Sequence, residues 1–141
     1  MLFKSSKNTS KIAKELSDLI VYCQTKSGGI TMEKIRTNKM KYYNMSSTHH
    51  ENMLNLSRSP ENRDELIKYH ETVLSRIYPK GVNVWSGNFS PVPHWKIGAQ
   101  MVALNIQTAG TYLRTNSSMF RQNGNSGYVL KPCLKKVLVQ N

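Results

Sequence analysis

Short apolar runs, bounded by polar or turn-forming residues, dominate the hydrophobic pattern of the chain. The run LIVYC favours a buried strand at about residues 18–23, although KELSDLIVYCQ is also compatible with the start of a helix. LSRIYPKG (74–81) is strand-like and stops at Pro79, while QMVALNIQT (100–108) and GYVLKP (127–132) are bounded by Gly, Asn or Pro. The pattern therefore predicts four short strands.

The clearest helical signal is SPENRDELIKYHETVL, residues 59–74. Ser59 is a suitable N-cap, and Pro60 fits the first helical position. An apolar stripe with the spacing i, i+3, i+4, i+7 indicates that one side of this helix is packed against the molecule: Leu66, Tyr69, His70 and Val73. A shorter helix is predicted over about residues 49–57, with Thr48 as its cap.

The segments between these elements are rich in turn-forming residues. Residues 24–45 contain many Gly, Lys and Asn residues, and we predict a long excursion with an edge strand there. The Pro-rich stretch GNFSPVPHW (87–95) is expected to be irregular, with Trp95 as an anchor.

Four near-continuous apolar strands with helical or loop crossovers are typical of a parallel sheet that is covered on both faces. The predicted fold class is therefore α/β. Four strands leave two bare sheet edges, and bare edges pair readily with other chains. We expect this chain to complete a larger sheet with another polypeptide or with a missing half.

Composition is that of a single globular domain. The chain has 141 residues, of which 20% are charged and 9% aromatic, with a mean hydropathy of −0.51. Cys23 and Cys133 form no CxxC motif and are compatible with reduced thiols in a cytosolic protein. The start MLFKSSKNTSK lacks the apolar core of a signal peptide, and no apolar run approaches the roughly 18 residues that span a bilayer. We expect neither a secreted nor a transmembrane protein.

The net charge of +12 adds a preference for anionic partners, such as nucleic acid, anionic membranes or phosphorylated ligands, although a solvated basic surface explains it equally well. No RNP-like, zinc or helix-turn-helix pattern accompanies the charge, which is spread along the chain. We therefore expect no nucleic-acid partner.

Arg76 and Tyr78 form the most specific candidate site. Residues two apart in a strand point to the same face, so a guanidinium and an aromatic ring lie side by side just before Pro79. A guanidinium offers paired donors to phosphate oxygens, and an aromatic face covers the apolar face of a ring. This combination indicates a binding site rather than a core.

The series LSRIYPKG, NFSP, QMVALNIQT and NGNSGYVLKP, preceded by KELSDLIVYC, resembles the Y region of eukaryotic phosphoinositide-specific phospholipase C. The resemblance covers about residues 11–136, with a linker remnant or flexible tail at 1–10 and a tail at 137–141. In that family the X and Y regions each supply half of a TIM-type (β/α)8 barrel. The resemblance thus implies a C-terminal half barrel, which agrees with the bare sheet edges.

The family hydrolyses phosphatidylinositol 4,5-bisphosphate to diacylglycerol and inositol trisphosphate, in lipid catabolism and intracellular signal transduction. Its calcium ligands and two catalytic histidines belong to the X region, so the resemblance implies no catalytic residue and no metal ligand in this chain. His49 and His50 are expected to be a surface pair, and His70 and His94 carry the same structural interpretation, one on a helix and one in a loop.

The resemblance implies that the Y region recognises the substrate. Arg76 matches the residue that binds the 4-phosphate, Tyr78 the residue that packs against the inositol ring, and Ser47 the serine of a motif similar to M-S-S-F-S-E. Here that segment is MSSTHHEN (45–52), which departs from the motif directly after Ser47. Leu54 and Val82 fall near positions that insert into the membrane, although Leu54 is equally compatible with the core of a short helix.

The implied partners are phosphatidylinositol 4,5-bisphosphate, an X-region half barrel in the same or another chain, and the membrane surface. The implied location is cytoplasmic and peripheral, at the inner face of membranes. Two hypotheses stay open: an incomplete half of an enzyme that lacks the catalytic X half, and a catalytically inactive inositol-phosphate or phosphoinositide binding or regulatory module.

Overall fold

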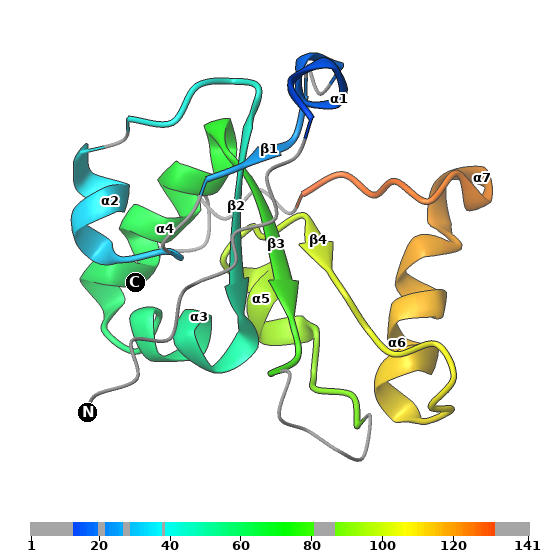
Figure 1. Ribbon diagram of the computed structural model, residues 1–141. Coiled ribbons are helices and arrows are strands. Elements are labelled where there is room, and N and C mark those ends of the chain that lie inside the picture. Colours follow the sequence, from blue (N-terminus) through cyan, green and yellow to red (C-terminus); the bar gives the residue numbers. More distant parts are fainter. Residues whose placement is uncertain (1–12, 20–21, 27–28, 38, 81–86, 132–141) are drawn as a thin grey trace, which may run out of the picture.

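A computed structural model describes residues 13–19, 22–26, 29–37, 39–80 and 87–131 (Figure 1). The predicted tails at residues 1–10 and 137–141 lie outside these ranges, as does Cys133. The described elements, in chain order, are α1 (Lys14–Asp18), β1 (Gln24–Thr25), α2 (Met32–Thr37), β2 (Asn44–His49), α3 (His50–Leu56), α4 (Pro60–Thr72), β3 (Leu74–Tyr78), α5 (Val92–Lys96), β4 (Met101–Val102), α6 (Thr111–Phe120) and α7 (Gln122–Asn125).

The four strands form one parallel sheet in the order β1-β2-β3-β4. Helix α2 lies between β1 and β2 in the chain, α3 and α4 lie between β2 and β3, and α5 lies between β3 and β4. The two longest strands, β2 and β3, run side by side and end next to α3 (Figure 1). The predicted fold class, α/β with parallel strands and helical or loop crossovers, is confirmed.

Two of the four strands lie elsewhere than the sequence predicts. The run at 18–23 is wrong as a strand, because α1 ends at Asp18 and β1 begins only at Gln24, after a left-handed Cys23. GYVLKP is also wrong, because its described part contains no strand and leaves Tyr128 and Leu130 79% and 93% exposed. The described apolar residues at the two ends of LIVYC, Leu19 and Tyr22, are also exposed, at 77% and 67%, and residues 20–21 lie outside the described ranges. For the described residues of both runs, hydrophobicity gave a false strand signal. The predicted strand at 100–108 is reduced to Met101–Val102.

Strand β2 is the element that hydrophobic periodicity missed, because its buried face is polar. Asn44, Ser46 and Thr48 are buried. Hydrogen bonds pair most of these groups: the amide oxygen of Asn44 accepts from Lys41 N (3.1 Å), Ser46 Oγ donates to the Leu74 carbonyl (3.3 Å), and Thr48 Oγ1 accepts from Asn52 Nδ2 (2.9 Å). The buried Nδ2 of Asn44 has no hydrogen-bond partner among the described residues. A buried polar strand is stable when its groups are paired, but it carries no apolar alternation.

The two predicted helices are present as α3 and α4. Helix α4 has the predicted Ser59 N-cap, whose Oγ accepts a hydrogen bond from Asn62 N at 3.2 Å, and the predicted apolar stripe is buried. Helix α3 begins one residue later than predicted and is capped by His49 rather than Thr48. Helices α2 and α6 were not predicted.

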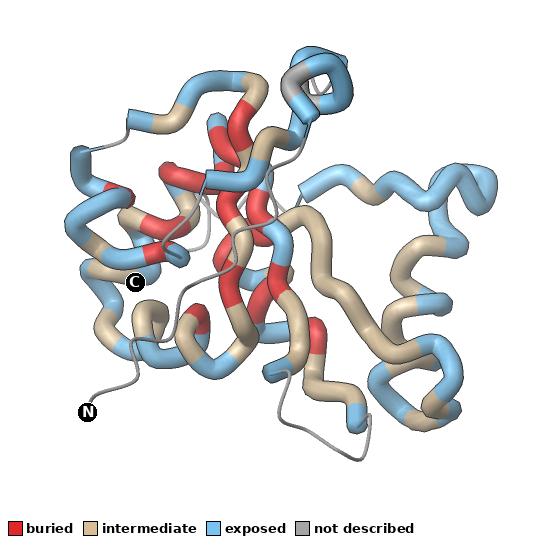
Figure 2. The backbone as a smooth tube through the Cα atoms, viewed as in Figure 1, coloured by how far each residue is buried: buried red, intermediate tan, exposed pale blue. Residues whose placement is uncertain are grey.

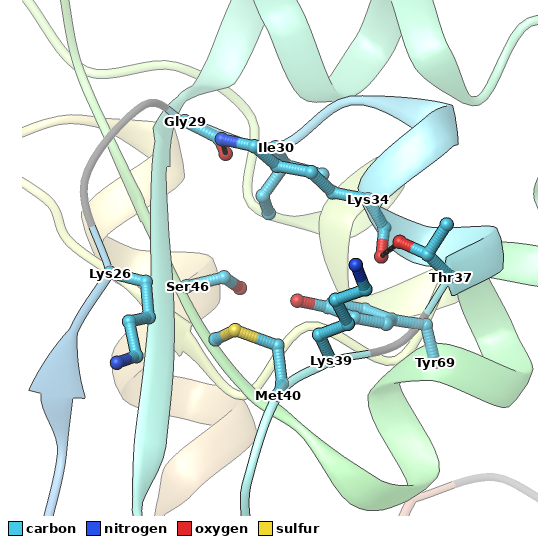
Figure 3. Close-up of a pocket in the computed structure, with 9 residues that line it drawn as sticks. All are labelled: Lys26, Gly29, Ile30, Lys34, Thr37, Lys39, Met40, Ser46 and Tyr69. Carbon is cyan, nitrogen blue, oxygen red and sulfur yellow. Dashed lines mark hydrogen bonds between the residues drawn. The ribbon is translucent and has the colours of Figure 1, made fainter.

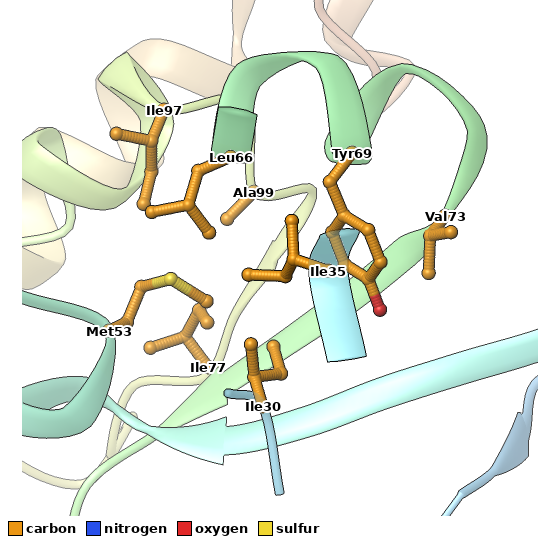
Figure 4. Packing of buried hydrophobic residues seen from close by; sticks show 9 residues of the cluster. All are labelled: Ile30, Ile35, Met53, Leu66, Tyr69, Val73, Ile77, Ile97 and Ala99. Carbon is orange, nitrogen blue, oxygen red and sulfur yellow. The ribbon is translucent and has the colours of Figure 1, made fainter. Parts of the chain in front are cut away.

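The core lies on one face of the sheet. Ile77 of β3 packs there with Met53 of α3 and Leu66 of α4, and all three side chains are fully buried (Figure 4). The other members of this cluster are Ile30, Ile35, Tyr69, Val73, Ile97 and Ala99. Along β2 and β3, buried and more exposed residues alternate, so the opposite face of the sheet is uncovered within the described chain (Figure 2).

Gln100 connects the end of α4 to the sheet. Its Oε1 accepts a hydrogen bond from Ser75 N (3.0 Å), and its Nε2 donates to the carbonyls of His70 (2.8 Å) and Val73 (3.2 Å). The side chain therefore pairs three backbone groups at the point where the chain turns from α4 into β3.

We expect Gln100→Met to lower the free energy of unfolding by about 1–3 kcal/mol, because methionine fills a similar space but leaves the Ser75 amide without an acceptor. The measurement is urea unfolding followed by circular dichroism. Gln122→Met, at an exposed position of α7, is the matched control and should change stability by less than about 0.5 kcal/mol. Equal effects of the two substitutions would contradict the role of Gln100.

Two histidines, His70 and His94, are buried in the interior of the described chain. The His50 ring stacks on Phe89 with centroids 4.4 Å apart, and His94 meets Phe89 edge-on at 5.3 Å. His94 lies in α5 and is fully buried, so its predicted loop position is wrong. His49 and His50, predicted as a surface pair, are both half-buried, and Nδ1 of His50 is buried. Burial lowers the pKa of His50, and it lowers the pKa of both His94 and His70 to about 4. These imidazoles are therefore neutral at neutral pH.

The buried histidines predict a loss of stability in acid. Below pH 6.5 these histidines become protonated in the unfolded chain, whereas in the folded chain they stay neutral down to about pH 4. The free energy of unfolding is therefore constant above pH 6.5 and falls as the pH is lowered from 6.5 to about 4. Each histidine contributes a slope of at most about 1.4 kcal/mol per pH unit. His94→Leu should flatten the profile measured by urea unfolding from pH 7.5 to 4.5, and a profile parallel to that of the unsubstituted chain would contradict this account.

Candidate functional site

The predicted site residues lie together on the uncovered face of the sheet. In the parallel register Ser47 of β2 pairs with Arg76 of β3, and His49 pairs with Tyr78. Neighbouring strands lie about 4.8 Å apart, so the side chains of one such face are within reach of a single small ligand. Ser47, Arg76 and Tyr78 are thus brought to one face, at the carboxyl ends of two adjacent strands.

Arg76 and Tyr78 contact each other directly. The guanidinium Cζ of Arg76 lies 5.1 Å from the ring centroid of Tyr78, within the range of a cation–π contact. Arg76 is exposed and Tyr78 is half-buried, so the ring supports a cation that faces outward. Two ion pairs of the described residues, Arg36–Glu65 and Lys80–Glu51, do not use Arg76. The arrangement can bind an anion at the guanidinium and a flat apolar surface at the ring.

Two interactions near the carboxyl ends of β2 and β3 were not predicted from the sequence. Lys80, after β3, pairs with Glu51, after β2, with Nζ 2.9 Å from Oε2. The hydrogen bond from Lys80 lowers the pKa of the Glu51 carboxyl, and both side chains are about half exposed. His49 ends β2, and its Nδ1 accepts from Asn52 N at 3.3 Å to cap α3. All three residues lie at or within two residues of a strand's carboxyl end, which is the signal that would have marked them, had β2 been recognised.

Of the two predicted membrane-contact residues, Leu54 lies within the described ranges. Leu54 lies on α3, next to the ends of β2 and β3, and is 37% exposed. Val82 lies outside the described residues. No helix within the described ranges is long and apolar enough to span a membrane.

Metal ligation finds no support in the described part of the chain. No three His, Cys, Asp or Glu side chains gather there in a way that could hold an ion. The described residues therefore do not fit a calcium site.

Comparison with known proteins identifies the relatives of this chain. The sequence matches the family described as phosphatidylinositol-specific phospholipase C, Y domain, over residues 16–134. The 1-phosphatidylinositol 4,5-bisphosphate phosphodiesterase delta-4 of Xenopus laevis is 36% identical over 92% of this chain and 16% of that protein. The gamma-2 phosphodiesterase of Homo sapiens is 40% identical over 89% of this chain and 9% of that protein. Inactive phospholipase C-like protein 2 of Homo sapiens is 34% identical over 89% of this chain and 11% of that protein.

Solved structures agree with the sequence matches. The crystal structures of L. pealei PLC21 and S. officinalis PLC21 each superpose with a TM-score of 0.76 at 36% identity, covering 87% of this chain and 15% of those chains. The fold is the TIM-type half barrel predicted from the sequence. The chain spans less than a fifth of the length of these relatives. It belongs to the Y-domain family of the phosphatidylinositol-specific phospholipases C.

Proposed function

We propose that this chain is the substrate-recognition half of a phosphoinositide phospholipase C, binding the head group of phosphatidylinositol 4,5-bisphosphate at Ser47, Arg76 and Tyr78. The observation that carries the proposal is the register of β2 and β3, in which these three residues share the uncovered face of the sheet. In the complete enzyme the bound lipid is cleaved to diacylglycerol and inositol trisphosphate, as part of intracellular signalling and lipid breakdown.

Each side chain has a distinct role in this proposal. The Arg76 guanidinium donates paired hydrogen bonds to the phosphate on the inositol 4-position. The Tyr78 ring, which lies 5.1 Å from that guanidinium, covers the C–H face of the inositol ring and holds the arginine outward. The Ser47 hydroxyl, opposite Arg76 in the register, donates to the same phosphate group.

The proposed protein partner is an X-region half barrel, supplied by the same polypeptide or by another one. The uncovered sheet face and the outer edges of β1 and β4 are the surfaces that the other four strands of a barrel would occupy. Catalytic acid–base groups and calcium ligands belong to that half in the proposal, because the described residues offer no calcium site. We assign no catalytic residue to this chain.

At the membrane, the proposed contact is peripheral and at the cytoplasmic face. Leu54 is an exposed apolar residue beside the carboxyl ends of the strands, and Lys80, which pairs with Glu51, lies near the same ends with about half of its side chain exposed. An apolar side chain flanked by a cation suits the interface of an anionic bilayer. Val82, which follows Lys80 in the sequence, is a second proposed contact.

A specific observation favours a second candidate function. One of the similar proteins is named inactive phospholipase C-like protein 2, at 34% identity, so this Y domain is similar to those of active and inactive proteins alike. The alternative is a binding or regulatory module that holds an inositol phosphate or phosphoinositide without cleaving it. Both functions use the same Arg76 site, and they differ in whether the completed barrel hydrolyses lipid.

Binding of inositol 1,4,5-trisphosphate tests the proposed site. Arg76→Ala should weaken binding, measured by isothermal titration calorimetry, at least about tenfold, because it removes a charge-assisted contact to phosphate. Arg58→Ala, which removes an exposed arginine from the turn between α3 and α4, is the matched control and should leave the affinity within about twofold. Unchanged binding by the Arg76 variant would reject the site.

We also expect the purified chain by itself to have no phospholipase activity. The purified chain should release no inositol trisphosphate from labelled phosphatidylinositol 4,5-bisphosphate, with or without calcium, because proton transfer and metal assistance must come from groups that the proposal places in the X half. Calcium-dependent release by this chain without a partner would show that the assignment of roles is wrong.

A further inference from the structure

A cavity of about 380 Å³ lies on the face of the sheet that carries Ser46 (Figure 3). It lies between β2 and residues 29–37 and 39–40, which include α2, and Tyr69 of α4 lines it from the helical layer. Ser46 lies in its wall, whereas the next residue, Ser47, belongs to the uncovered face, because successive strand residues point to opposite faces. The cavity is therefore separate from the proposed head-group site.

The interior of the cavity is mainly apolar. Ile30, Met40 and the ring of Tyr69 form much of its wall. Two hydroxyl groups, those of Ser46 and Tyr69, point into the space (Figure 3), and these residues are only 5% and 6% exposed. Burial raises the pKa of the Tyr69 phenol, so the hydroxyl stays protonated at neutral pH and can donate a hydrogen bond. An apolar pocket with a few polar groups at fixed positions is typical of small-molecule sites, which have volumes of about 300–1,000 Å³.

The rim of the cavity is basic. Lys26, Lys34 and Lys39 line it, and no carboxylate is among the lining residues that the structure describes. Lys34 Nζ donates to the carbonyl of Gly29 at 3.1 Å, which holds this ammonium group at the rim. The sequence from residue 19 to residue 50 contains five Lys or Arg residues and one acidic residue, Glu33. The local charge therefore favours an anion.

We propose that this cavity binds an amphipathic anion, with a carboxylate or phosphomonoester head at Lys34 and Lys39 and a short apolar body against Ile30, Met40 and Tyr69. Charge complementarity selects the head, and the apolar wall selects the body. The inference does not depend on the proposed function, because none of the residues of the head-group site lines the cavity. Such a ligand exists either free in solution or as part of a membrane lipid, and the two sources share this chemistry.

Octanoate is the probe for the free ligand, and calorimetry or amide NMR shifts measure its binding to the full chain. The double variant Lys34→Gln with Lys39→Gln should weaken binding at least about tenfold, through loss of two charge-assisted contacts. Lys96→Gln with Arg114→Gln, at exposed positions of α5 and α6, is the matched control and should bind like the unsubstituted chain. Arg76→Ala should also bind normally, because it lies on the other face.

The second variant, Met40→Trp, fills the cavity and keeps the lysines, and it should abolish binding as well. Octanol, which has the same apolar body without a charge, should bind at least about tenfold more weakly than octanoate. Vesicles of phosphatidylcholine with phosphatidic acid test the membrane source through co-sedimentation. A response of octanoate to the lysine variant identifies a free ligand, and a response confined to the vesicles identifies a lipid.

Two results would overturn the proposal. One is that neither octanoate nor the vesicles respond to the lysine variant or to Met40→Trp, as judged on variants whose amide spectra show the native fold. The other is that octanol binds as tightly as octanoate, since the basic rim would then have no part in recognition.

Discussion

The parallel register of β2 against β3 is the constraint on which the rest of the molecule depends. It sets Ser47 opposite Arg76 and leaves Tyr78 on the same face, while Ile77 enters the core on the other face. A slip of one residue would exchange the two faces and separate the site residues. The register is supported from the core side, where Met53 and Leu66 pack against Ile77, and where Gln100 pairs the backbone at the start of β3.

The same register gives the sheet two unlike faces. Helices cover the face that carries Ile77, and the cavity with the basic rim lies between that face and the helical layer. The face that carries Arg76 is uncovered within the described chain, as expected for the inner surface of half a barrel. A site on the inner face becomes enclosed only when the barrel is complete. In the proposed function the Y domain positions substrate-binding groups, and the X half supplies the cleavage chemistry.

Helix α4 and the Arg76–Tyr78 pair could be predicted from the sequence because each has a local physical signal. Ser59 and Pro60 mark the start of α4, and the two-residue spacing places Arg76 and Tyr78 on one face. Ser47 could be found only through the family resemblance, since β2 buries hydrogen-bonded polar groups and has no apolar alternation. The runs LIVYC and GYVLKP were predicted as strands only because their side chains are apolar. An apolar run indicates a tendency to be buried, but it does not specify the type of element or the surface against which it packs. The ion pair of Lys80 with Glu51 and the buried His94 depend on contacts between elements that are distant in sequence.

In the proposed function, the uncovered face is the inner wall of a barrel whose other half is an X region. Sedimentation velocity of an equimolar mixture of this chain with an X-region half barrel tests it most directly. The account predicts a single species with the mass of a one-to-one complex, formed at micromolar concentration. Two components that sediment independently would contradict it, as would a chain that already closes its sheet by pairing with a second copy of itself.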